Sequence, residues 1–130
     1  MNKPFLVLTV LVSTVFSSSP SYAEWTEVGT HVDGHKYYVD FETIKKNGGY
    51  IYYWRLRDYI KPDKWGDFSS KVFQQVDCKL SKYIVLGDSY HTGPMGGGET
   101  STSSNDPDTE WSNIVPGSIG ELVQKSVCSM

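Results

Sequence analysis

Hydrophobic and polar residues along five segments of this chain follow patterns typical of β-strands: some segments alternate, and others are rich in strand-favouring residues or contain a short apolar run. The segments run from Trp25 to Thr30, His35 to Asp40, Tyr50 to Tyr59, Ser70 to Cys78 and Lys82 to His91. Asp33 and Gly34 form a turn signal between the first two segments, which predicts a hairpin. The other three are long and consecutive, so we expect them to form an antiparallel meander.

The segment from Tyr50 to Tyr59 gives the strongest strand signal, and its period of two divides it into two faces. One face carries Tyr52, Trp54 and Leu56, and the other carries Ile51, Tyr53, Arg55 and Arg57. We expect the face with Trp54 to be buried and the face with the two arginines to point outward.

The apolar spacing changes to a helical period near the C-terminus. Pro116 and Gly117 interrupt the preceding segment, Ser118 is a good N-cap, and Glu121 completes a capping box. The apolar residues then fall on one helical face: Ile119, Leu122, Val123 and Val127. The predicted fold class is α+β, an antiparallel sheet of about five to six strands packed by one C-terminal α-helix.

Two shorter regions interrupt the strands. Asp40 is placed to cap one helical turn from Phe41 to Lys45. The stretch from Thr92 to Asp108 is rich in glycine and small polar residues, which bury little apolar surface. We expect it to be a mobile loop without regular structure, of a length that is often functional in a compact domain.

The first residues carry the signature of a secretory signal peptide. Lys3 precedes a short apolar core, and the small residues Ser21 and Ala23 fit a cleavage site after Ala23. The apolar core is shorter than the roughly 20 residues that cross a bilayer. We therefore expect residues 1–23 to be removed, and residues 24–130 to form one exported domain, periplasmic or secreted, without membrane insertion. No cysteine stands at the cleavage site, so no lipid anchor is expected.

The negative net charge of the chain disfavours partners that are themselves strongly negative. The formal net charge is -3, and removal of Lys3 with the signal changes it to about -4. An acidic domain lacks the clustered lysine and arginine that bind phosphate backbones or anionic membranes. Nucleic acid is therefore excluded as a predicted partner.

Cys78 and Cys128 are the only cysteines in the chain. Because an exported protein reaches an oxidising compartment, the two are expected to form a single disulfide. That bond would join the end of a central strand to the last turn of the predicted helix, and it would leave no free thiol for metal, lipid or catalysis.

No group of residues indicates catalysis, a cofactor or a metal. His31, Asp33 and His35 have ligand side chains, but they lie on a predicted turn and lack a third histidine nearby. Asp88, Ser89 and His91 are triad residue types without a nucleophile elbow, and neighbours on one strand are not expected to adopt triad geometry.

The candidate binding residues lie on the predicted outward face of the third strand. Arg55 and Arg57 are the only arginines in the chain, and the strand period places them beside Tyr53. Arginine and aromatic residues are favoured at interface centres, so this face is a candidate protein-binding patch. Trp65, which lies in a connection, is the tryptophan that most deviates from a packing role.

The order of motifs resembles the surface-adhesin protein E family of bacteria. The motifs are Trp25, the YYVD of residues 37–40, the W-x-L-x-D-Y of residues 54–59, the strand ending in Asp77-Cys78, and the closing W-x-x-I-x-P-G-S segment that ends in Val127-Cys128. The resemblance implies an antiparallel sheet packed by a C-terminal helix, a Cys78 to Cys128 disulfide, and attachment to host extracellular-matrix and serum proteins. On this basis we expect an exported binding protein that engages a host matrix protein or a protein of the envelope.

Two alternatives remain beside this hypothesis of a non-enzymatic binding protein. One is a soluble periplasmic protein with a structural or stress-related role and no host ligand. The other is a small periplasmic hydrolase, which would need a pocket that brings His35 or His91 together with a carboxylate.

Overall fold

The structure is a computed structural model that describes residues 24–130. The predicted signal peptide, residues 1–23, lies outside the described residues. The strands are β1 (Trp25–Thr30), β2 (Lys36–Asp40), β3 (Lys45–Asn47), β4 (Tyr50–Asp58), β5 (Ser69–Asp77), β6 (Lys82–His91), β7 (Thr100–Ser104) and β8 (Ser112–Asn113). The helical elements are the 3-10 turns η1 (Phe41–Thr43) and η2 (Pro94–Gly96) and the helix α1 (Ile119–Cys128).

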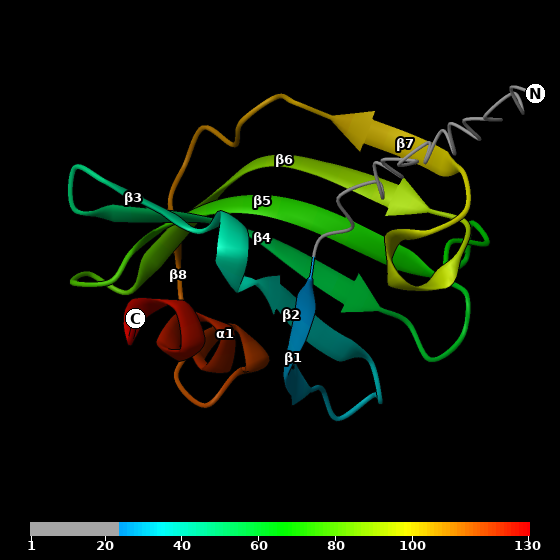
Figure 1. Cartoon of the computed structure of the whole chain (residues 1–130), viewed down its shortest axis with the longest axis horizontal. Helices are drawn as coiled ribbons and strands as arrows, with labels where there is room; N and C mark the ends of the chain where they lie inside the picture. Colours follow the sequence, from blue (N-terminus) through cyan, green and yellow to red (C-terminus); the bar gives the residue numbers. More distant parts are fainter. Residues whose placement is uncertain (1–23) are drawn as a thin grey trace, which may run out of the picture.

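The strands form one antiparallel sheet in the order β1-β2-β4-β5-β6-β7 (Figure 1). β3 also pairs with β4, and β8 also pairs with β6. The predicted hairpin and the predicted meander of β4, β5 and β6 are both confirmed. The sheet has 8 strands, more than predicted, because β3, β7 and β8 are short, polar and exposed, and therefore carry no alternating pattern.

The helix begins as the sequence predicts. The side chain of Ser118 accepts a hydrogen bond from the backbone N–H of Glu121 at 3.2 Å. Val123 and Val127 lie on the buried face of the helix, whereas Leu122 is 47% exposed. β1 approaches the helix closely at Gly29, where an added Cβ atom would lie 2.6 Å from the Leu122 side chain. Alanine at this position would therefore require the ends of the Leu122 and Ile119 side chains to shift.

The main core lies between α1 and one face of the sheet. Val39, Val76, Val123 and Val127 are each at most 2% exposed, and Tyr53 and Ile51 complete the same cluster. The expectation that the Trp54 face would be the buried one was therefore wrong for this end of β4. Strand alternation separates two faces, but it does not say which of them the helix covers.

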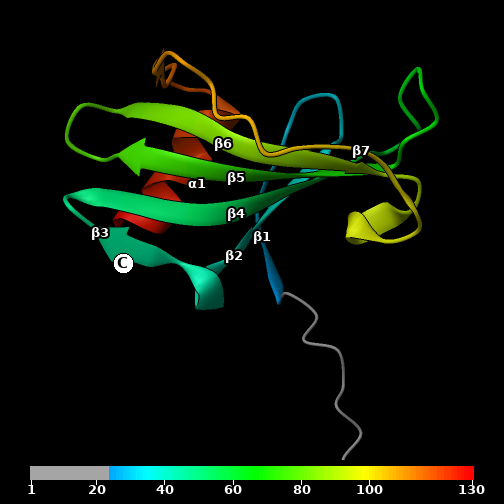
Figure 2. The same cartoon turned by 90° about the horizontal axis from the view of Figure 1, so that it is seen from above.

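The opposite face of the sheet is covered at its other end. Leu56, on the Trp54 face, is 0% exposed, and it lies beneath η2, where Gly96 approaches its side chain. Trp54 itself is partly buried and stacks on Phe73 with ring centroids 5.0 Å apart. Figure 2 shows α1 and η2 at different ends of the long strands. Each face of the sheet is thus covered at one end, one face by α1 and the other by η2.

The prediction of a structureless loop from Thr92 to Asp108 was wrong, because this segment contains η2 and β7. The hydroxyl of Ser69 donates to the Gly93 carbonyl at 2.7 Å and accepts from the Gly96 N–H at 2.8 Å. Glycine conformations and hydrogen bonds, rather than apolar burial, hold the segment against the sheet. A hydrophobicity pattern does not report such interactions.

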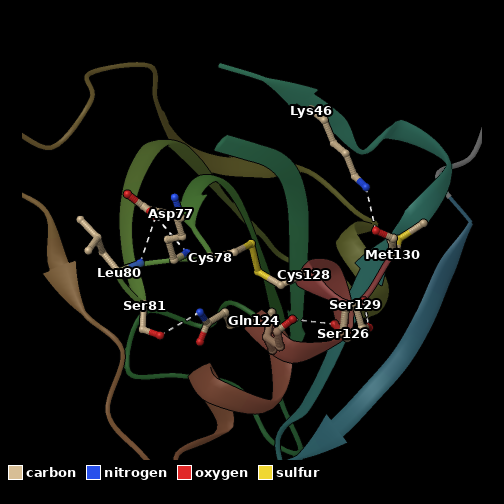
Figure 3. The surroundings of a disulfide bond; sticks show 12 residues. Lys46, Asp77, Cys78, Leu80, Ser81, Gln124, Ser126, Cys128, Ser129 and Met130 are labelled. Atoms are coloured by element: carbon tan, nitrogen blue, oxygen red, sulfur yellow. Dashed lines mark hydrogen bonds between the residues drawn. A yellow bond between two sulfur atoms is a disulfide. The ribbon is translucent and has the colours of Figure 1, made fainter. Parts of the chain in front are cut away.

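The predicted disulfide is confirmed. Cys78 and Cys128 are bonded, with Cα atoms 5.9 Å apart and 50 positions apart in sequence. Figure 3 shows that this bond joins the turn after β5 to the last turn of α1. Nearby, the Gln124 side chain donates to the Ser81 hydroxyl at 3.2 Å, which adds a polar contact between the same two elements.

Candidate functional site

Tyr53 lies inside the protein, which corrects its predicted place on an outward surface. Its side chain is 3% exposed, and its hydroxyl donates to the Gln74 side chain at 2.6 Å. Burial raises the pKa of Tyr53 to about 12, although the charge of Arg55 opposes the shift. Tyr53 is thus a core residue beneath the arginines rather than a contact residue.

Arg55 and Arg57 lie side by side on β4 and are held by tyrosines of neighbouring segments. Both guanidinium groups lie over the Tyr37 ring, at 5.4 Å and 5.7 Å from its centroid, respectively. Arg57 also lies 5.3 Å from the Tyr59 ring centroid. Stacking of this kind fixes the planar guanidinium and limits its side-chain entropy. We call Arg55, Arg57, Tyr37 and Tyr59 the arginine face.

The arginine face has unused hydrogen-bonding capacity. The Nε atoms of Arg55 and Arg57 are buried and have no hydrogen-bond partner among the described residues. Arg57 Nη2 lies 3.6 Å from Asp33 Oδ2, whereas Arg55 has no carboxylate within 4.0 Å in residues 24–130. Arg55 can therefore take an acidic partner without displacing an existing ion pair.

Two hollows adjoin the arginines. Arg55 lines a hollow of about 230 Å³ between the sheet and the segment that leads into α1, and Tyr53, Ile114 and Ile119 also line it. Arg57 lines a second hollow of about 310 Å³. The other residues that line it are His35, Tyr59, Lys61, Pro62, Asp63, Trp65 and Tyr90. The arginines thus lie at the border between a partly apolar depression and a polar, aromatic one.

The hairpin histidines gather around one carboxylate. Asp33 Oδ1 lies 3.0 Å from His31 Nδ1, and Asp33 Oδ2 lies 3.5 Å from His35 Nε2. Desolvation raises the pKa of Asp33, but the His35 backbone N–H and the His31 ring outweigh it, so this pKa falls below its usual value. His35 Nδ1 accepts the Ile60 N–H at 3.1 Å. Among the described residues no three acidic, histidine or cysteine side chains are grouped to hold a metal.

Ser89 and His91 are closer than the sequence suggested. The Ser89 hydroxyl lies 2.7 Å from His91 Nε2, because residues two apart on a strand share a face. The other ring nitrogen faces the Thr100 hydroxyl at 3.4 Å rather than a carboxylate. Burial lowers the pKa of His91, the charge of Lys71 lowers it further, and Asp67 opposes the shift. His91 is 5% exposed, and its contact with Ser89 is partly buried.

Trp65 is on the surface, as its place in a connection predicted. Its side chain is 73% exposed. It borders a third hollow of about 310 Å³, which Asp67, Tyr90, Ser101 and Thr102 also line. These four residues could not be selected from the sequence, because they lie in three separate segments: the β4–β5 loop, β6 and β7. Only the pairing of the strands brings these segments together. The Tyr90–Thr102 pairing of β6 with β7 builds this wall.

These features define a small α+β domain, closed by one disulfide, whose polar and aromatic surface is suited to binding. Within residues 24–130, no helix has the length and apolar character that crossing a bilayer requires. The chain belongs to the surface-adhesin protein E family, whose model matches residues 25–129.

Solved structures with the same fold agree with this assignment. Crystal form II of Haemophilus influenzae protein E superposes with a TM-score of 0.63 at 12% identity, covering 83% of this chain and 89% of that one. Protein E from non-typeable Haemophilus influenzae has a TM-score of 0.58 at 12% identity, covering 85% and 79%, respectively. No curated protein matches the chain in sequence. At this identity the likeness shows the fold alone.

Proposed function

We propose that this chain is an exported, non-enzymatic binding protein that engages an acidic segment of a host matrix or envelope protein through the arginine face. The family membership supports a role in surface adhesion. The single observation that carries the proposal is the pair of guanidinium groups over the Tyr37 ring, of which that of Arg55 has no carboxylate within 4.0 Å in residues 24–130.

The physical argument rests on preorganisation. The Tyr37 ring beneath both guanidinium groups holds them before a partner arrives, so binding orders few additional rotamers. A carboxylate that approaches Arg55 gains charge-assisted hydrogen bonds in a partly desolvated place. Arginine beside tyrosine is also the composition found at energetically dominant interface positions.

Binding of the mature chain to purified matrix proteins and to envelope extract tests the proposal. We expect the double variant Arg55→Ala and Arg57→Ala to weaken saturable binding roughly tenfold or more. Lys79→Ala is the matched control, because it removes a positive charge from an exposed turn at the far end of β5. Binding that is unchanged in the double variant, or the absence of any saturable partner, would contradict the proposal.

A second variant separates charge from shape. Replacement of both arginines by lysine keeps the charge but removes the planar fork that stacks on tyrosine and pairs with carboxylates. We expect Arg55→Lys and Arg57→Lys together to restore only part of the binding. Full restoration would show that charge alone attracts the partner, and the stacked geometry would then have no role.

The site of action is tested by fractionation. Because the sequence predicts export, we propose that the mature protein acts outside the cytoplasm. Protein at the cell surface or in the medium would fit a host matrix partner, and protein confined to the periplasm would fit an envelope partner. Protein retained in the cytoplasm with residues 1–23 uncleaved would contradict both.

A further inference from the structure

We propose that the hollow beside Trp65 is a saccharide-binding site, distinct from the arginine face and independent of the protein-binding role. Its wall residues are Trp65, Asp67, Tyr90, Ser101 and Thr102. None of them is one of the four residues of the arginine face, but Trp65 and Tyr90 also line the hollow of Arg57 and Tyr59. Variants therefore separate the two proposals: the arginine double variant tests one, and Trp65→Ala tests the other.

The chemistry of the lining fits a sugar. A pyranose ring has flat patches of C–H groups, which pack on aromatic faces, and a rim of hydroxyl groups that both donate and accept hydrogen bonds. Trp65 supplies an indole that is 73% exposed, and Tyr90 supplies a second aromatic ring in the same hollow. Aromatic side chains contribute large contact areas with a polar edge.

The polar side of the hollow complements the hydroxyl rim. Asp67 is 4% exposed, and its Oδ1 atom accepts the Ser101 hydroxyl at 2.6 Å. No hydrogen bond to its Oδ2 atom is found among residues 24–130, so this carboxylate oxygen is free to accept. Ser101 and Thr102 add hydroxyl groups that both donate and accept.

The loop that carries Trp65 is held rigidly in place. Asp63 Oδ1 accepts the backbone N–H groups of Trp65 and Asp67, both at 2.9 Å. The Asp63 N–H in turn donates to the Asp67 carbonyl at 2.9 Å. An exposed tryptophan on a loop closed in this way is presented to solvent at little conformational cost to binding.

The size of the hollow selects a short ligand. Its volume of about 310 Å³ is at the lower end of the roughly 300–1,000 Å³ of ligand pockets, which suits one sugar ring of an oligosaccharide chain. Lys64 Nζ lies 4.2 Å from the Trp65 ring centroid, so a positive charge stands beside the hollow. The site can therefore accept a neutral or an acidic glycan.

Two probes distinguish the sources of such a chain. Chitotetraose represents neutral amino-sugar chains of the cell-wall type, and a hyaluronan tetrasaccharide represents acidic chains of the animal matrix. Titration calorimetry of the mature chain with each probe, together with tryptophan fluorescence, measures binding. We expect saturable binding of at least one probe below about 10 mM, with a change in indole emission.

Variants locate the binding. Trp65→Ala should weaken it roughly tenfold or more and abolish the emission change, and Asp67→Asn should weaken it less. Trp111→Ala is the matched control, because Trp111 is 38% exposed but stacks on Tyr50 in another region. The arginine double variant should bind the sugar normally.

Three outcomes would overturn the proposal. The first is no saturable binding of either probe, and the second is sugar binding that Trp65→Ala leaves unchanged. The third is a loss of protein binding, but not of sugar binding, in Trp65→Ala, which would assign Trp65 to a protein interface.

Discussion

The two ends of the sheet are held together by different interactions. At one end, α1 covers apolar residues such as Val39 and Val76, and the disulfide joins the helix to β5. At the other end, buried polar residues such as Ser69, Asp67 and His91 join η2, β7 and the loop after β4. We call these the helix end and the loop end. Apolar burial thus stabilises the helix end, whereas hydrogen bonds hold the segments of the loop end, which carry the exposed polar and aromatic side chains.

This division has a physical reason. A binding surface must expose polar and aromatic groups, so the segments that carry it cannot also bury a large apolar core. Hydrogen bonds fix such segments in one geometry with little apolar area. The loop end therefore contributes less apolar burial to the free energy of unfolding. The disulfide and the buried valines at the helix end compensate for this difference.

The largest expected effect is at the helix end. Cys78→Ser combined with Cys128→Ser opens a loop closed by residues 50 positions apart, which the chain-entropy model values at about 4 kcal/mol. Urea denaturation should show a loss of this size, and thermal unfolding a clearly lower midpoint. A thermal midpoint equal to that of the parent would mean that the disulfide contributes little to stability. The helix end would then not be the main source of stability in this domain.

The next effect is at the loop end. Ser69→Ala removes the two hydrogen bonds that join β5 to Gly93 and Gly96, and it leaves buried partners unpaired, so we expect a loss of about 2 kcal/mol. Amide exchange should become faster in η2 and β7 but not in α1. Ser103→Ala, on the exposed face of β7, is the control and should change little. Equal acceleration of exchange in α1 would show that the two ends do not unfold separately.

A smaller effect follows from the buried phenol at the helix end. Because the pKa of Tyr53 is about 12 in the folded protein and 10.0 for the free side chain, the unfolded chain loses its proton first. Stability is therefore complete below pH 10 and falls as the pH rises from there toward 12.

Comparison of the parent with Tyr53→Phe measures this term. At about pH 11 the parent should have lost roughly 1.4 kcal/mol more than the variant, relative to neutral pH. Denaturation midpoints over that range provide the measurement. Parallel pH profiles of the two proteins would mean that the Tyr53 hydroxyl is in contact with water. Such a result would contradict the burial of Tyr53 at the helix end.

The smallest effect concerns His91 at the loop end. Its pKa is below 6.5 in the folded protein, so the unfolded chain takes up a proton first as the pH falls. Stability should be complete above pH 6.5 and decrease below it, and His91→Gln should flatten that decrease. Chemical-denaturation midpoints between about pH 7 and pH 5 test this. A parent profile that is flat, or steeper in the variant, would exclude His91 as the titrating group.

The main elements of the fold were predictable because local patterns encode them. The capping box at Ser118 and Glu121 marks the start of the helix, and strict alternation marks β4, β5 and β6. The disulfide followed from the presence of only two cysteines in a chain predicted to be exported. The short strands β7 and β8 were not predicted, since exposed edge strands contain polar residues on both faces.

The candidate site was less predictable. Arg55 and Arg57 could be selected because they share one strand face, and Trp65 because it lies in a connection. Tyr37, which lies beneath both guanidinium groups, comes from β2, whereas Tyr59 follows Arg57 by only two residues. Tyr53 was misplaced because the sequence does not say which sheet face receives the helix.

By itself the sequence determined the strands β1, β2, β4, β5 and β6, the capped helix, the cysteine pair and the family, since each depends on neighbouring residues or on their order. The tertiary structure alone decided which face of β4 is buried and which distant side chains meet. In the folded protein Tyr53 points into the core. The hollow beside Trp65 is formed by the β4–β5 loop, β6 and β7. The physical reason is that burial and site geometry depend on contacts between residues far apart in the chain, and no local pattern carries that information.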